Sequence, residues 1–452
     1  MSSDFATFSP TPAGPPSIWR EVRKLATLGF PIVISLAAAT LIGVVDTIMI
    51  APLGTLSLAA ASVTTSVIII FYSGLYGFVS AVGVRMAEAR GKQSPDALSA
   101  TTRTGIRIAL VAGTIGAGLM LSLRPALHLL GQPPEVIALL GGYWTAMSLF
   151  LIPFTVFYAL KGLFDAIDAP WVGVGLAFLG VVVNVPANWL LIHGIGSWEG
   201  WGLVGAGLAS LLSQLVSLSL AWVIWRKAKL TRDARLPAPS SKSERKLQLT
   251  QGGTIALGYI GEGGAYAFAG LMMGWFSAVA LAANQIVSAV AGVLYMVPLG
   301  VSIAVSIRIG QAVGADQRKR LKTIGLAALT VIISWMALVM GGLLLGGGTL
   351  AQALSTDPEV ISLATSMLIV VAAMQIADGI QGTMLGACRG MMDNLVPVAI
   401  TMFSYWVIAL PIGYLLGFVL GFGPNGVWIG YGMGLAVAAT AVTVRFFGKV
   451  KD

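Results

Sequence analysis

The chain has 452 residues, of which 57% are apolar and only 10% carry a charged side chain. A soluble globular protein carries roughly a quarter of its residues as Asp, Glu, Lys or Arg, so this composition excludes a soluble fold. A transmembrane β-barrel is excluded as well, because its strands alternate apolar and polar residues, whereas the apolar runs here are long and continuous. The net charge of +9 does not predict a nucleic-acid partner, because Lys and Arg stand in short clusters between the apolar runs, as in proteins oriented in a lipid bilayer.

A helix needs about 20 apolar residues to cross a bilayer whose hydrocarbon core is about 30 Å thick. Runs of this kind follow one another along the whole chain. They lie at 26–50, 57–82, 105–123, 136–157, 169–192, 202–225, 252–275, 280–304, 323–346, 359–387, 395–420 and 425–444. The sequence therefore predicts an all-α membrane protein with twelve transmembrane helices.

Positive charge sets the orientation of such a protein, because Lys and Arg are enriched in cytoplasmic segments. If both termini are cytoplasmic, Arg124 is the one residue among the 27 Lys and Arg that falls on the outer side. A miscounted helix would place the charges on both sides. We therefore expect a multi-pass protein of the cell (inner) membrane with both termini in the cytoplasm.

The two halves of the chain resemble each other. Positions 58–91 match positions 281–314 without a gap, and the identical pairs include Tyr72 with Tyr295 and Arg85 with Arg308. The copies begin six helices apart, which predicts two six-helix bundles related by a parallel internal repeat. The predicted parts are a cytoplasmic tail (1–25), an N-lobe (26–225), a cytoplasmic linker (226–250), a C-lobe (251–445) and a second cytoplasmic tail (446–452).

Three acids lie inside predicted spans: Asp46 in the first helix, Glu262 in the seventh and Asp378 in the tenth. A carboxylate in the middle of a bilayer costs at least about 2.5–3.5 kcal/mol, so such a residue is a functional candidate. It can be protonated or paired with a cation, and the alternative is a carboxyl capped by neighbouring backbone or Ser/Thr groups. With no Lys or Arg expected at mid-span, the pattern favours a mobile cation, Na⁺ or H⁺, at Asp46 or at Glu262 and Asp378.

Neutral amides also lie inside predicted spans. Asn184 and Asn188 are four residues apart and share a helix face, and Gln375 and Gln381 lie three residues either side of Asp378. Amide oxygens are suitable ligands for hard cations. The alternative role for each amide is a hydrogen bond between helices.

Further candidates concern substrate binding and bending. Asp46, Tyr266, Gln285, Gln375 and Gln381 are the candidate substrate-binding residues. Pro31 in the first helix and Gly261 and Gly263 beside Glu262 are candidate hinges, since proline and glycine loosen a helix, although a fixed kink is the alternative. The single cysteine, Cys388, excludes an intramolecular disulfide, and the sequence has no Walker A motif to bind ATP.

Several segments carry a resemblance to a known family, the multidrug and toxic compound extrusion (MATE) transporters, and within it to the NorM-type branch. The segments are VVDTIM at 44–49, NVPANW at 184–189, GAG at 205–207, AANQ at 282–285, VSIRIG at 305–310 and GACRG at 386–390, with Glu262 and Asp378 between them. The resemblance covers essentially the whole chain, and its strength lies in the order and spacing of the segments.

The resemblance implies alternating-access export of cationic or amphiphilic organic compounds in exchange for inward Na⁺ or H⁺, without another cofactor and by a monomer. Asp46 with Asn184 and Asn188 resembles the family's N-lobe cation site, and Glu262 and Asp378 resemble its C-lobe acidic pair. Two positions depart from the family pattern: Met374 replaces a tyrosine four residues before Asp378, and Asn284 replaces a histidine before Gln285. Because Met374 lacks the hydroxyl of that tyrosine, the site has one oxygen fewer that could bind Na⁺.

Two other functions are compatible with a helical membrane protein. A flippase of the same superfamily, moving a lipid-linked saccharide, would be expected to carry basic residues in the cleft. A membrane-embedded enzyme acting on lipid would need clustered His/Asp or Ser/His chemistry near one interface. Asp165 and Asp168 come nearest to such a cluster, and their position favours a role at a helix end.

Overall fold

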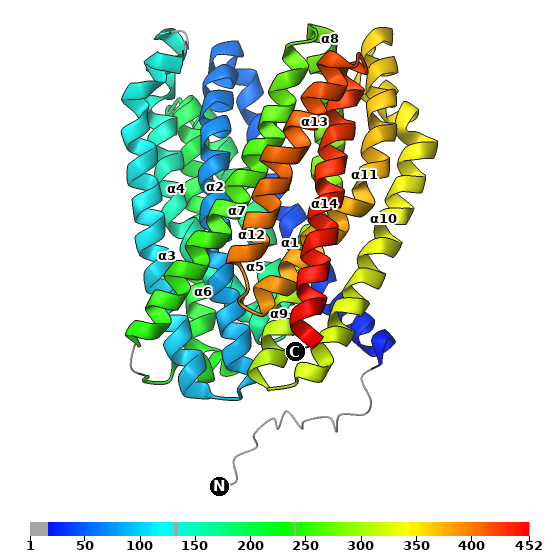
Figure 1. Ribbon diagram of the computed structural model, residues 1–452. Coiled ribbons are helices and arrows are strands. Elements are labelled where there is room, and N and C mark those ends of the chain that lie inside the picture. Colours follow the sequence, from blue (N-terminus) through cyan, green and yellow to red (C-terminus); the bar gives the residue numbers. More distant parts are fainter. Residues whose placement is uncertain (1–16, 131–133, 239–240, 452) are drawn as a thin grey trace.

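The computed structural model describes residues 17–130, 134–238 and 241–451, and in these residues the chain is almost wholly helical (Figure 1). Eleven helical segments of this part of the chain are long and apolar enough to cross a membrane. A further helix, α7 (Lys242–Gly274), has 33 residues and lies among them (Figure 1). Its many glycines and Glu262 lower its hydropathy. The predicted all-α fold with twelve membrane helices is confirmed.

Six helices form the N-lobe. They are α1 (Ile18–Ile50), α2 (Thr55–Gly91), α3 (Pro95–Leu123), α4 (Pro134–Ala166), α5 (Pro170–His193) and α6 (Gly202–Lys227). Short 3-10 turns, η1 (Ala51–Leu53) and η2 (Arg124–Leu130), follow α1 and α3. Prolines open α3, α4 and α5, because the first turn of a helix needs no backbone donor there.

The C-lobe starts with α7 and continues with a span that is interrupted at Tyr295. Its helices are α8 (Ala278–Leu294), α9 (Met296–Gly314), α10 (Arg318–Leu354), α11 (Pro358–Gly390), α12 (Leu395–Phe403), α13 (Leu410–Tyr414) and α14 (Gly423–Lys451). The π-helical segment η5 (Ser404–Ala409) joins α12 to α13, and a second one, η6 (Leu415–Val419), continues α13, so that all four segments form one span.

The internal repeat is visible in the helix lengths. Helices α1 and α7 have 33 residues each, and so do α4 and α11. Helix α2 has 37 residues, as does the span Ala278–Gly314 that comprises α8 and α9. The two bundles therefore repeat one architecture, as the sequence predicts.

Helix ends differ from the predicted boundaries because apolar runs mark only the part of a helix that lies in lipid. Helix α2 continues nine residues past the predicted end at 82, and α7 begins inside the predicted linker 226–250. Ser241 caps α7 there by accepting a hydrogen bond from the Glu244 amide. The rest of the linker holds two turns, η3 (Lys229–Thr231) and η4 (Asp233–Arg235). Of the predicted tails, residues 1–16 and 452 lie outside the described residues, and the remainder is largely helical.

Helix α1 begins and α14 ends at the same end of the bundle, which we call the terminal end (bottom of Figure 1). The two lobes meet near it. A Cβ atom on Gly91 of α2 would lie 2.0 Å from the Gln311 carbonyl oxygen of α9, and one on Gly314 would lie 2.0 Å from that of Glu88. Only glycine permits so close an approach. The lobes are therefore closed against each other at the terminal end.

One group of charges at this end lies within the C-lobe alone. Asp393, between α11 and α12, pairs with Arg445 at 2.9 Å and Lys449 at 3.4 Å, both on α14. Partial burial opposes ionisation of Asp393, but the hydrogen bond from Arg445 and the charges of both cations outweigh it and hold the pKa of Asp393 below its ordinary value. This pair therefore stays ionised at neutral pH and fastens α14 to its own lobe.

Candidate functional site

The N-lobe site is a carboxylate held by three helices. Asp46 of α1 accepts hydrogen bonds at Oδ1 from the side-chain amides of Asn184 (3.1 Å) and Asn188 (2.6 Å), both on α5. Its Oδ2 accepts a hydrogen bond from the hydroxyl of Ser210 on α6 at 2.7 Å. Asn188 also donates to the side-chain oxygen of Asn184 at 3.0 Å. The structure thus brings together the three residues that the sequence singled out in this lobe.

Both asparagines are fully buried, with 0% of their surface exposed. They turn their amide nitrogens toward Asp46, whereas the sequence analysis considered their oxygens as cation ligands. The side-chain oxygen of Asn188 has no hydrogen-bond partner. The arrangement therefore stabilises a negative carboxylate through donated hydrogen bonds and leaves one buried acceptor beside it.

Sequence reasoning missed Ser210, which carries no signal beyond its place three residues after the GAG segment at 205–207. Because a hydrogen bond to a charged group contributes about 1.5–3 kcal/mol, Ser210→Ala is expected to slow any process that depends on Asp46 by about tenfold or more. Transport rates in reconstituted vesicles measure this. Ser213→Ala is the matched control, since Ser213 bonds only the Ser210 backbone; equal losses in both variants would contradict a role for the Ser210–Asp46 contact.

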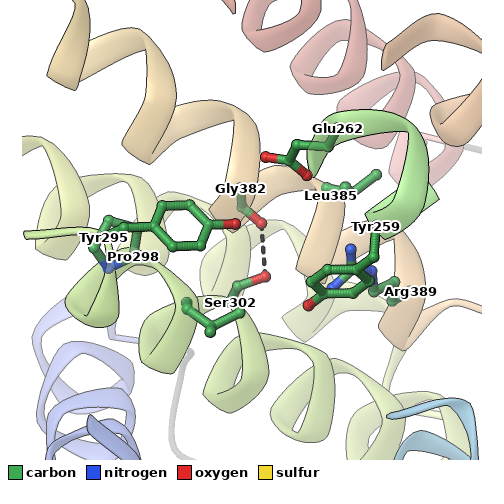
Figure 2. A pocket seen from close by; sticks show the side chains of 9 residues that line it. Tyr259, Glu262, Tyr295, Pro298, Ser302, Gly382, Leu385 and Arg389 are labelled. Atoms are coloured by element: carbon green, nitrogen blue, oxygen red, sulfur yellow. Dashed lines mark hydrogen bonds between the residues drawn. The ribbon is translucent and has the colours of Figure 1, made fainter. Parts of the chain in front are cut away.

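The C-lobe site is a small cavity of about 10 Å³ between α7, α9 and α11 (Figure 2), room for about one water molecule. It is lined by Tyr259, Glu262, Tyr295, Pro298, Leu299, Ser302, Gly382, Leu385 and Arg389. Ser302 closes one side through a 2.6 Å hydrogen bond to the Gly382 carbonyl. The Glu262 carboxylate and the Tyr295 hydroxyl point toward the middle of this group in Figure 2.

Asp378 belongs to the same cluster, although it does not line the cavity. Its charge interacts with that of Glu262. The hydroxyls of Tyr295, Tyr405 and Tyr431 lie within electrostatic range of both carboxyls. The structure therefore brings Glu262 and Asp378 into one polar cluster in the C-lobe, separate from Asp46.

Arg389 corrects one expectation from the sequence, that no cation stands near the membrane acids. It lines the cavity that contains Glu262, is only 7% exposed, and donates to the Tyr259 hydroxyl at 3.0 Å. The signal was present in the helical period, because Asp378, Gly382, Leu385 and Arg389 recur every three or four residues on one face of α11. The apolar run of this helix ends at 387, which predicts that Arg389 lies at the helix end, in water.

A second cavity, of about 50 Å³, lies between the lobes. Tyr76 of α2 packs edge-on against Tyr158 of α4 and Tyr259 of α7 along its wall. Lys161 and Asp165 form a buried ion pair there at 2.8 Å, and Asp165 lies at the end of α4, as the sequence predicts. Arg389 lines this cavity too, so the two cavities share one cation.

The other candidate substrate-binding residues do not converge on one pocket. The Tyr266 hydroxyl donates to Ser288 at 3.2 Å, and Gln285 is exposed on α8. Gln375 is 3% exposed, and Gln381 is fully buried with both side-chain polar atoms lacking a partner. Neither cavity described above is lined by these residues or by Asp46.

The candidate hinges differ from one another. Helix α1 continues through Pro31 without a break. At Gly261 the carbonyl accepts a hydrogen bond from the Trp406 indole at 3.1 Å, and a Cβ atom would meet Met402, so this glycine permits close packing of α7 on α12. A Cβ atom on Gly263 would meet no atom within 4 Å.

Comparison with known proteins agrees with the geometry. A family model described as MatE matches residues 31–190 and 255–415, one match in each lobe. The chain is 31% identical to the multidrug resistance protein NorM of Burkholderia vietnamiensis, over 98% of this chain and 97% of that one. It is 30% identical to a probable NorM of a Synechococcus strain, over 95% and 94%. A crystal structure of a Vibrio cholerae MATE transporter superposes with a TM-score of 0.86 at 20% identity, covering 96% of this chain and 98% of that one.

Proposed function

The chain belongs to the MatE family, and from this we propose that it exports cationic or amphiphilic organic compounds from the cytoplasm in exchange for inward Na⁺ or H⁺. As a member of this family it is a multi-pass membrane transporter and not an enzyme. Its relatives are named multidrug resistance proteins, which supports the proposed substrate class. The clusters of Lys and Arg at the terminal end support a cytoplasmic location of both termini in the inner membrane.

The observation that carries the proposal is the attachment of α1 to α5 and α6 through Asp46. These three donors favour the charged carboxylate. A cation that neutralises Asp46 weakens all three hydrogen bonds at once and changes how α1 is held in the N-lobe. Binding of the coupling ion is thereby linked to the position of a helix, which an antiporter requires.

At Asp46 the residues fit a proton better than Na⁺. Protonated Asp46 can donate a hydrogen bond to the Asn188 oxygen, which has no partner, after that amide turns over. Na⁺ needs several oxygens, but the Asn184 oxygen already accepts from Asn188. In the C-lobe, Glu262 lies near Arg389 and also interacts with Asp378, and either Na⁺ or H⁺ fits the second negative charge of this cluster.

The closed terminal end supports alternating access. Cavities of about 10 and 50 Å³ are too small for an organic drug, whose binding pockets measure about 300–1,000 Å³. Access from the terminal end therefore requires the lobes to separate there. The cations Lys161 and Arg389 do not favour the flippase function, because one is paired with Asp165 and the other faces Glu262.

The test is efflux of a fluorescent organic cation from vesicles containing the purified protein, with a Na⁺ gradient and a pH gradient imposed separately. We expect at least one gradient, acting alone, to raise the initial rate about tenfold or more over protein-free vesicles. The pH gradient should suffice if Asp46 carries a proton. Transport of a lipid-linked saccharide, or efflux that needs ATP with both gradients collapsed, would contradict antiport.

A further inference from the structure

Two groups of charged residues at the terminal end join one lobe to the other. In the first, Arg85 of α2 binds Glu244 of α7 through two parallel hydrogen bonds, from Nη2 to Oε2 at 2.5 Å and from Nε to Oε1 at 3.1 Å. Arg85 also contacts Glu88 on its own helix. The pair joins the second helix of the N-lobe to the first helix of the C-lobe.

In the second group, Glu21 of α1 is bound from the opposite lobe. Arg308 of α9 donates to its Oε2 at 3.0 Å, and Arg320 of α10 donates to its Oε1 at 2.5 Å. Arg308 also donates to Gln311 on its own helix at 2.9 Å. Here the first helix of the N-lobe is joined to α9 and α10 of the C-lobe.

The two groups are copies of each other under the internal repeat. The same offset of 223 residues relates Glu21 to Glu244, Arg85 to Arg308 and Glu88 to Gln311. Each arginine thus binds the acid at the start of the first helix of the other lobe. The offset also relates Gly91 to Gly314, the glycines at which α2 and α9 come closest. The contact is therefore reciprocal, as between two halves related by a two-fold axis.

Burial distinguishes these pairs from ordinary surface ion pairs. The Glu21 side chain is 2% exposed, Arg308 14%, and Arg85 and Glu244 13% and 12%. Exposed ion pairs contribute little to stability. In a buried pair the attraction offsets a large loss of hydration, and the hydration returns when the two groups separate in water. Such a pair is stable while the lobes are in contact, and its two groups separate into water at a modest net cost. Replacing only one of the two residues instead leaves an unpaired buried charge.

We propose that Arg85–Glu244 and Arg308–Glu21 form a pair of repeat-related latches that hold the lobes closed at the terminal end and open once in each transport cycle. The four side chains are positioning residues, since they lie away from Asp46 and the Glu262 cavity. The inference rests on the proposed alternating access. It adds the residues whose separation opens the route from the cytoplasm.

The experiment measures opening directly, without substrate or ion gradient. Cys388 is the single cysteine, so Cys388→Ala gives a background in which Asp96→Cys and Lys319→Cys carry spin labels. Both positions are exposed, one on α3 and the other on α10 at the terminal end. The distance distribution between the labels reports separation of the lobes in the full-length protein in lipid nanodiscs.

Arg85→Glu and Arg308→Glu are each expected to raise the ratio of open to closed protein about tenfold or more, seen as a longer distance. The exchange Arg85→Glu with Glu244→Arg is expected to restore the short distance, because it rebuilds the pair with opposite polarity. Arg445→Glu, which breaks the Asp393 pair inside the C-lobe, is the matched control and should leave the distribution unchanged.

The neutral variant Glu244→Gln keeps the test decisive where a charge reversal does not fold. A wild-type distance distribution in folded Glu244→Gln and Arg308→Glu would overturn the latch, as would an exchange variant that stays open. Loss of efflux with an unchanged distribution would count against the latch and leave the proposed antiport standing. A longer distance in a protein that transports no drug would support the latch and contradict the proposed function.

Discussion

Asp46→Asn is expected to reduce cation-driven efflux at least about a hundredfold, to the level of protein-free vesicles. The asparagine keeps the size of the side chain and can still accept from the amides of Asn184 and Asn188. It removes the charge and cannot take up a proton. If the coupling ion acts by neutralising this carboxylate, the variant is fixed in the neutral state and the cycle stops.

The measurement is the initial rate of efflux in vesicles, with the amount of inserted protein and its melting temperature determined in parallel. Asp46→Glu is the matched control, because it retains a titratable group on the same helix and should keep part of the activity. Wild-type efflux by a well-inserted Asn variant would remove Asp46 from the coupling mechanism. A loss of activity accompanied by a large decrease in the melting temperature would show that the residue has a structural role.

The N-lobe site shows which features of a site can be predicted from the sequence and which cannot. Asp46 stands out because a bilayer penalises a lone carboxyl, and Asn184 and Asn188 stand out because their four-residue spacing puts them on one helix face. Which atom of each amide meets the acid depends on the packing of α1 against α5, and spacing does not specify that. Ser210 comes from a third helix, and hydroxyl residues on membrane helices are too common to mark a site.

At the helix ends the sequence was less informative. Apolar runs identify the lipid-embedded part of a helix. Helices α2, α7 and α14 continue beyond it into the polar region, because the backbone hydrogen bonds of a helix also form outside lipid. The residues assigned to loops on this basis include Arg85 and Arg308, which join the lobes. Their repeat relationship was present in the sequence, whereas their acidic partners became evident only when the lobes were placed together.

The acids of the two lobes are not repeat equivalents, and this has a consequence for coupling. Asp46 lies four residues before the end of α1, and Glu262 twelve residues before the end of α7. Asp46 has neutral donors around it, while in the C-lobe Arg389 lines the same cavity as Glu262. The N-lobe therefore holds one negative charge without a cation of its own, and the C-lobe holds two negative charges against one positive charge. On this balance we expect each lobe to take up one mobile cation.

This charge balance predicts the stoichiometry of coupling. An unbalanced buried ion costs several kcal/mol, so Glu262→Gln and Asp378→Asn are each expected to remove one exchanged cation per substrate, because each removes one negative charge from the C-lobe cluster. Arg389→Gln is expected to add one exchanged cation per substrate, if the coupled ion is the same in both lobes.

The reversal point, at which an ion gradient just balances a substrate gradient across the vesicle membrane, measures the ratio of exchanged cations to substrate. Met374→Leu, four residues before Asp378, is a volume-conserving control and should leave the ratio unchanged. A ratio that falls in Asp378→Asn but not in Glu262→Gln would show that Arg389 does not balance the two acids alike, and an unchanged ratio in both would exclude the C-lobe cluster from ion coupling.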